Sequence, residues 1–200
     1  MNVFISGGCK NGKSYYAQRR ARALAGGEGE TGPLTKKLYY IATMIPHDDE
    51  DRARIRRHLS EREGWGFETV EQGKNLTEIL NKNVDPGGVF LLDSVTAVME
   101  NEMYPVALKE RGDEKVIVFL GEDADASERV KRDMVRFAEE IKRNGGSVVF
   151  VSDGIYGDMN GYSESTEKYR QALAETDRAL AEVCDEVIEI AYGAEEIWKR

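Results

Sequence analysis

Cysteine is scarce in this sequence: Cys9 and Cys184 are the only two in 200 residues, and they lie far apart. So few thiols exclude a disulfide framework and favour a reducing compartment. Long apolar runs are also missing, and none approaches the roughly 20 residues that a membrane-spanning helix requires. The chain does not open with a basic segment followed by an apolar one, and its first expected strand starts almost at Met1. We therefore expect no signal peptide, no membrane span and a cytoplasmic protein.

The chain also has no excess of positive charge. The chain carries 28 lysines and arginines against 37 aspartates and glutamates, which gives a formal net charge of −9. This balance argues against a nucleic-acid partner, because binding to a phosphate backbone depends on a net basic surface. It does not exclude a nucleotide, which needs only a local positive pocket. With 40% apolar residues, the chain is long enough for a sizeable core, and we expect one domain over residues 1–200.

One motif is present in full. The segment Gly7–Ser14 reads GGCKNGKS and fits the pattern G-x-x-x-x-G-K-[ST] of a phosphate-binding P-loop. An expected strand precedes it and an expected helix, Ser14–Leu24, follows it, which is the context that the motif requires. Lys13 would neutralise phosphate charge, and the Ser14 hydroxyl would hold Mg²⁺. The residues predicted to surround the β- and γ-phosphates of a nucleotide are Gly7, Gly8, Cys9, Lys10, Asn11, Gly12, Lys13 and Ser14.

Apolar runs alternate with helical patterns along the rest of the chain. Runs such as Val89–Leu92 and Val148–Val151 are continuously apolar, which is typical of strands buried on both faces of a parallel sheet. Strands are expected at 2–6, 38–42, 88–93, 147–152 and 186–191, with a short one at 67–70. The run 115–120 fits an edge strand, a hairpin or a lid. Together with the P-loop, this alternation predicts an α/β fold of the P-loop NTPase (RecA-like) type, a three-layer sandwich with a mainly parallel central sheet.

Two aspartates follow apolar runs. Asp93 comes after 89–92, and Asp153 comes after 148–152, where it opens a glycine-rich loop. An acid at the carboxyl end of a buried strand suits the second Mg²⁺-holding group of a P-loop site. We expect one of the two to have this role and favour Asp93, with Asp153 as the alternative.

A charged segment, 48–58, opens with acids and continues with arginines, an order that suits the dipole of a helix. Most such runs are solvated, charge-paired helices. His58 favours a second interpretation, because an imidazole near a triphosphate can attack phosphorus. Without further information an inert surface histidine is the commoner outcome, and His47 is as easily a loop residue.

The order of these motifs resembles the bifunctional adenosylcobinamide kinase/adenosylcobinamide-phosphate guanylyltransferases of cobalamin biosynthesis. The resemblance rests on the P-loop, on Y-I-A-T at 40–43, on a helix that ends in His58, and on L-L-D-S-x-T at 91–96 followed by Asn101. It spans most of the chain. The sequence departs from the family pattern after the fifth strand, where the family has N-E-x-G and this chain has SDGIYG at 152–157.

The resemblance implies two reactions. The γ-phosphoryl group of ATP or GTP passes to the aminopropanol hydroxyl of adenosylcobinamide. A histidine, by position His58, then attacks the α-phosphorus of GTP, releases pyrophosphate and carries GMP to the phosphorylated cobinamide. The resemblance also implies Mg²⁺ and a homo-oligomer, with a trimer as one option. Positions that match the family's nucleotide contacts are Thr43, Met44, Ile45, Leu59, Ser60, Glu61, Arg62, Glu71 and Asp93. Two alternatives stay open: a P-loop kinase of another small molecule, and a nucleotide-binding module without guanylyl transfer.

Overall fold

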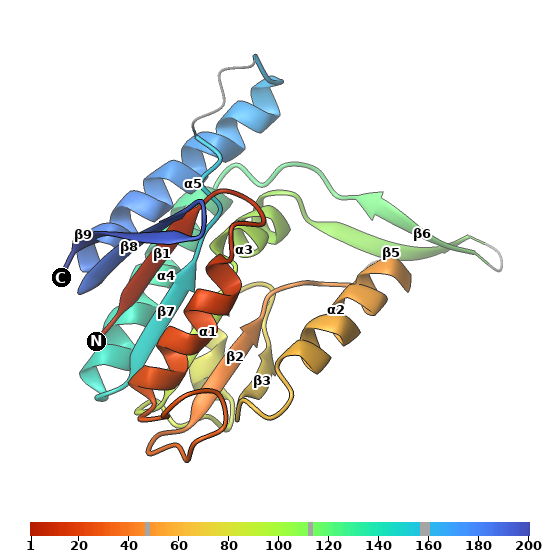
Figure 1. Cartoon of the computed structure of the whole chain (residues 1–200). Coiled ribbons are helices and arrows are strands. Elements are labelled where there is room, and N and C mark those ends of the chain that lie inside the picture. Colours follow the sequence, from red (N-terminus) through yellow and green to blue (C-terminus); the bar gives the residue numbers. More distant parts are fainter. Residues whose placement is uncertain (47–48, 112–113, 157–160) are drawn as a thin grey trace.

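A seven-stranded sheet forms the centre of the molecule (Figure 1). The computed structural model describes residues 1–46, 49–111, 114–156 and 161–200. The strand order is β3-β2-β4-β7-β1-β8-β9, and neighbouring strands are parallel except β8 and β9. The strands are β1 (Val3–Gly7), β2 (Leu38–Ala42), β3 (Glu68–Glu71), β4 (Val89–Asp93), β7 (Ser147–Val151), β8 (Glu186–Ala191) and β9 (Ala194–Lys199).

Helices cover both faces of this sheet. On one face lies α1 (Lys13–Leu24), and on the other lie α3 (Val95–Met103), α4 (Ala126–Arg143) and α5 (Glu164–Val183), with the 3-10 helix η1 (Leu76–Asn81) packed against α4. The remaining helix of the described chain, α2 (Asp49–Glu61), stands beside the β3 edge (Figure 1). No helix in the described ranges is both long and apolar enough to cross a membrane.

The central strands β4 and β7 are almost continuously apolar because both of their faces are buried. In β4, Phe90 and Leu92 face the core under α3, α4 and α5, and the Phe90 ring lies 5.5 Å from that of Phe137 on α4. Val89 and Leu91, between them in sequence, face the core under α1. Continuous apolar runs are therefore the sequence signature of this sheet, and the expected α/β fold is confirmed.

Expected and observed strands agree closely. All six form, and each end lies within one residue of its expected position. The run 115–120 belongs to a hairpin, one of its three interpretations: β6 (Glu114–Phe119) pairs antiparallel with β5 (Val106–Arg111) in a separate two-stranded sheet that extends away from the body (Figure 1). Strand β9 is not predicted because half of its sequence, AEEIWK, is charged and its residues are largely exposed.

A buried arginine anchors the glycine-rich loop that follows α1. The Arg22 side chain is 2% exposed, and its Nε donates a 2.7 Å hydrogen bond to the carbonyl of Gly29. Its other two guanidinium nitrogens donate to the carbonyls of Trp65 and Gly32. One charged group thus serves acceptors from two distant loops, which fixes the loop against the body of the molecule.

Replacing Arg22 by methionine should lower the free energy of unfolding by about 3 kcal/mol, because three carbonyls lose a charged donor while the apolar stem is retained. Chemical denaturation followed by circular dichroism measures this change. Arg19→Met, at an exposed position of the same helix, is the matched control and should stay within about 0.5 kcal/mol of wild type. Equal destabilisation by both substitutions would show that Arg22 does not anchor the loop.

Candidate active site

The P-loop joins the end of β1 to the start of α1. At Gly7 the backbone has φ +150°, and a Cβ there would overlap the carbonyl oxygen of Ile190 and the side chain of Asn11. Gly12 has φ +93° and is the N-cap residue of α1, without a side chain that could cap the helix. Both positions therefore require glycine. The first N–H groups of α1 open onto this loop, where an anion can accept their hydrogen bonds.

Lys13 has two partners at the loop. Its side chain is only 6% exposed, its Nζ donates a 2.6 Å hydrogen bond to the carbonyl of Gly8, and the same Nζ lies 2.9 Å from Oδ1 of Asp153. A backbone oxygen and the carboxylate of Asp153, two residues after the end of β7, thus hold the ammonium at the loop. Asp153 is the acid that contacts the P-loop lysine.

The other candidate acid, Asp93, contacts Ser14. Burial raises the pKa of Asp93, whereas the hydrogen bond from the Ser14 hydroxyl acts in the opposite direction. A hydroxyl and a carboxylate are the oxygen ligands that Mg²⁺ prefers. Within the described parts of the chain, no group of three or more His, Cys, Asp or Glu side chains could hold a metal. The Ser14–Asp93 pair therefore fits an ion that takes its remaining ligands from water and nucleotide phosphates.

A cavity of about 630 Å³ opens beside this pair. His58 of α2 lines it together with Ser14 and Asp93, and His58 lies close enough to Asp93 to lower the pKa of that carboxyl. The expected nucleotide contacts that line the same cavity are Thr43, Met44, Ile45, Arg62 and Glu71. Residues from β2, β3, β4, α1 and α2 therefore meet at one place.

Hydrogen bonds fix the wall of this cavity at the end of β2. The Thr43 hydroxyl donates to the carbonyl of Asp93 and accepts from the N–H of Ser94, both at 3.1 Å. The Asn101 amide donates to the carbonyls of Thr43 at 2.8 Å and Gly73 at 3.0 Å. Thr43 and Asn101, both from the motifs noted above, thus hold the loops after β2 and β3 against β4.

An arginine stacked on an aromatic ring forms another wall. The guanidinium carbon of Arg62 lies 3.5 Å from the centroid of the Tyr40 ring, and the Arg62 side chain is 7% exposed. This geometry keeps the positive charge of the guanidinium at the cavity, while the Tyr40 ring covers one planar face of the guanidinium. The charge is therefore available to an anionic group of a ligand.

Several expected contacts lie elsewhere. Leu59 and Ser60 are exposed on α2 and do not line the cavity. The side chain of Glu61, like all of residues 47–48 with His47, lies outside the described residues. The P-loop residues Gly8, Cys9, Lys10 and Asn11 line a neighbouring cavity against the end of β8.

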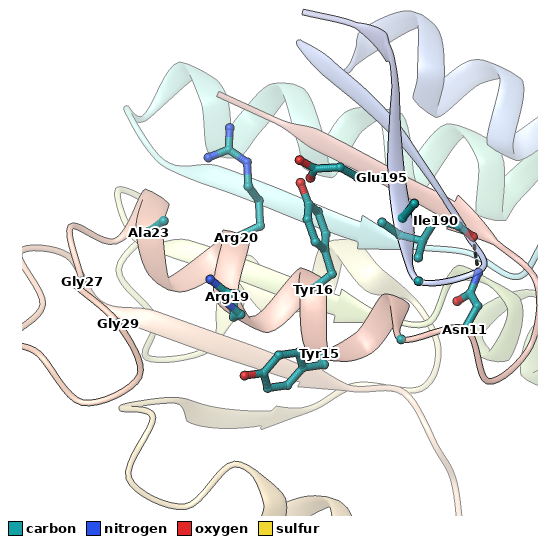
Figure 2. A pocket seen from close by; sticks show the side chains of 13 residues that line it. Asn11, Tyr15, Tyr16, Arg19, Arg20, Ala23, Gly27, Gly29, Ile190 and Glu195 are labelled. Carbon is teal, nitrogen blue, oxygen red and sulfur yellow. Dashed lines mark hydrogen bonds between the residues drawn. The ribbon is translucent and has the colours of Figure 1, made fainter.

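A larger cavity, about 810 Å³, lies between α1 and the β8–β9 hairpin (Figure 2). Tyr16 points toward Glu195 across it, and Asn11 marks the end nearest the P-loop (Figure 2). Lys13, Ser14, Asp93 and His58 are all missing from its lining. Because Ser14, Asp93 and His58 all line the smaller cavity, we take that cavity as the candidate active site.

The loop after β7 is tied to a buried carboxyl that sequence reasoning missed. The hydroxyls of Ser152, at 2.8 Å, and Tyr156 donate to Oδ2 of Asp177 on α5. Asp177 is 6% exposed, burial raises its pKa to about 7, and its Oδ1 is buried without a hydrogen-bond partner among the described residues. A signal was available: Asp177 lies four residues after Leu173, on the buried face of α5.

Comparison with known proteins decides the family. The family model described as cobinamide kinase/cobinamide phosphate guanyltransferase (CobU) matches residues 3–196. The chain belongs to this family. The resemblance inferred from the P-loop, His58 and the 91–96 motif is thereby confirmed.

Two curated relatives match over nearly their whole length. Both are bifunctional adenosylcobalamin biosynthesis proteins CobU. The one from Escherichia coli (strain K12) is 27% identical over 96% of this chain and 97% of its own. The one from Salmonella typhimurium (strain LT2) is 26% identical over the same shares.

Two solved structures are also similar, each at 13% sequence identity over 99% of this chain. Flagellar accessory protein FlaH from Methanocaldococcus jannaschii is covered over 77% of its chain with a TM-score of 0.49. The KaiC-like protein PH0186 from Pyrococcus horikoshii is covered over 78% with a TM-score of 0.48.

Asp177→Asn should change how stability depends on pH. The folded-state pKa of Asp177, about 7, lies above its ordinary value of 3.8. Between these values the folded protein keeps a proton that the unfolded chain has lost, so wild-type stability falls as pH rises through this range. The asparagine variant lacks this fall. The free energy of unfolding of the variant minus that of wild type should therefore rise by on the order of 3 kcal/mol between about pH 4.5 and 7.5.

Urea denaturation at several pH values measures this difference. Asp123→Asn is a control that should stay flat, because the Arg129 hydrogen bond lowers the pKa of Asp123 and this carboxyl is therefore ionised in both the folded and the unfolded state across this range. A flat difference for Asp177→Asn across this range would contradict a buried carboxyl that titrates near neutrality.

Proposed function

We propose that this protein phosphorylates adenosylcobinamide with ATP or GTP and then transfers GMP from GTP to the product, which gives adenosylcobinamide-GDP. The observation that carries the proposal is the meeting of His58, Ser14 and Asp93 at one cavity beside the P-loop. Membership of the cobinamide kinase/cobinamide phosphate guanyltransferase family supports it. The proposal treats residues 1–200 as one domain and one functional unit that acts in the cytoplasm.

In both reactions the P-loop would hold the β- and γ-phosphates. The N–H groups at the start of α1 would donate to phosphate oxygens, and Lys13 would exchange Asp153 for them. Ser14 and Asp93 would hold Mg²⁺, which when bound neutralises charge that develops on the phosphate oxygens. One phosphate-binding site can therefore serve two reactions that differ in the phosphorus atom attacked.

For guanylyl transfer, an imidazole nitrogen of His58 would attack the α-phosphorus of GTP. A P–N bond forms, the bond from the α-phosphorus to the bridging oxygen breaks, and pyrophosphate leaves. A phosphate oxygen of the phosphorylated cobinamide then attacks the same phosphorus and releases His58. The cavity supports this arrangement, because His58 lines it together with Ser14 and Asp93.

The guanine nucleotide would occupy the cavity lined by Thr43, Met44 and Ile45. The Glu71 carboxylate can accept from the N–H edge of guanine, and the Arg62 guanidinium can pair with phosphate. We also propose that Leu59, Ser60 and Glu61 contact the nucleotide, because they lie on α2, the helix that carries His58. A corrinoid is too large for a cavity of 630 Å³. We therefore place the acceptor on an open or intersubunit surface, consistent with a homo-oligomer.

A second candidate function is phosphorylation of a different small alcohol, without guanylyl transfer. The observation that favours it is the segment SDGIYG at 152–157, which replaces the family's N-E-x-G. Assays of phosphoryl transfer to adenosylcobinamide and to other alcohols separate the two candidates.

Incubation with GTP labelled at the α-phosphate tests the histidine directly. Wild type should acquire an acid-labile, alkali-stable label with release of pyrophosphate, because a phosphoramidate has this stability profile. In His58→Ala the label should fall to background. His47→Ala, which removes the other histidine of the chain, is the matched control and should label like wild type. Equal labelling of His58→Ala and wild type would overturn the proposed intermediate.

A further inference from the structure

Asp153 occupies a position that phosphate must reach. Its Oδ1 lies 2.9 Å from the Nζ of Lys13. In P-loop sites this ammonium contacts the β- and γ-phosphates. A terminal phosphate that binds Lys13 therefore comes to lie beside the Asp153 carboxylate, whose side chain is 35% exposed and so open to a further ligand.

The backbone around Asp153 is held on several sides. Its N–H donates a 3.1 Å hydrogen bond to Oγ1 of Thr96, and the next N–H, of Gly154, donates a 2.9 Å bond to the carbonyl of Gly7 in the P-loop. The flanking Ser152 and Tyr156 are fixed by the buried Asp177. The carboxylate is thus preorganised relative to the phosphate-binding loop, as a group that acts on a reacting atom must be.

The two acids at this edge have different partners. Asp93 pairs with the Ser14 hydroxyl, whereas Asp153 pairs with Lys13. Strand β7 lies between β1 and β4, so Asp153 follows a strand placed between the one that precedes the P-loop and the one that ends in Asp93. Under the proposed function Ser14 and Asp93 would hold the metal ion, so Asp153, beside Lys13, is left for a different role.

A carboxylate beside an anionic phosphate is repelled unless a proton donor lies between them. The hydroxyl of the acceptor is such a donor, and the partly exposed Asp153 carboxylate leaves room for it beside the phosphate that Lys13 would bind. We propose that Asp153 accepts the proton of the acceptor hydroxyl during phosphoryl transfer, an inference that rests on the proposed kinase function.

In this step the hydroxyl oxygen forms a bond to the γ-phosphorus, and the bond from the γ-phosphorus to the bridging oxygen breaks. ADP or GDP leaves, and the hydroxyl proton passes to the Asp153 carboxylate and then to solvent. Attack of His58 on the α-phosphorus needs no such proton acceptor at Asp153. The two reactions therefore depend on Asp153 to different extents.

Asp153→Asn tests this difference, because asparagine keeps the size of the side chain but is a poor proton acceptor. The kcat for phosphorylation of adenosylcobinamide with ATP should fall by about 10²- to 10⁴-fold. The KM for ATP should stay within about threefold of wild type or decrease, since Lys13 loses a competing partner. Labelling by GTP carrying α-³²P should proceed within about threefold of the wild-type rate, which also shows that the variant is folded.

Asp153→Glu should recover part of the lost kcat, whereas Asp125→Asn, at an exposed position near the start of α4, should leave both reactions unchanged. A kinase kcat within about threefold of wild type in Asp153→Asn would overturn the proposal. So would a parallel loss of both reactions with a higher Mg²⁺ requirement, because that result marks a metal ligand. If the wild-type protein phosphorylates no adenosylcobinamide, the proposed function itself is overturned. If wild type and Asp153→Asn are equally active, only the role of Asp153 is overturned.

Discussion

Parallel pairing of β1, β7 and β4 is the constraint on which the site depends. Parallel strands bring their carboxyl ends to one edge of the sheet, so the residues that follow them become neighbours however far apart they lie in sequence. Through this geometry Lys13 and Ser14 after β1, Asp93 at the end of β4 and Asp153 after β7 share one edge. Burial of both sheet faces keeps that edge rigid.

The sequence predicted the elements with a strong local signature. The central strands are predictable because burial on both faces makes runs such as 89–92 and 148–151 continuously apolar, and the P-loop because its backbone requires glycine at positions 7 and 12. Charge order predicts a helix for His58 and the family resemblance implies its role, but neither predicts its position beside Asp93. Asp93 was preferred over Asp153, and the contact between Asp93 and Ser14 supports that preference.

What could not be predicted depends on contacts between distant segments. The ion pair of Lys13 with Asp153 joins residues separated by most of the chain, and no local sequence pattern predicts it. Strand β9 gives no continuous apolar run, because it forms the largely exposed edge of the sheet. Leu59 and Ser60 are exposed on the last turn of α2, whereas Arg62 follows the end of the helix and lines the cavity.

The central claim is that one P-loop serves both reactions, with the nucleophile for the second supplied by α2. Lys13→Met tests it most directly, because methionine keeps an apolar stem of similar length and removes only the ammonium. The account predicts that phosphorylation of adenosylcobinamide and labelling by GTP both fall by roughly 10²-fold or more in this variant. Loss of one reaction with the other at the wild-type rate would show that the two reactions use separate phosphate sites, and would contradict the account.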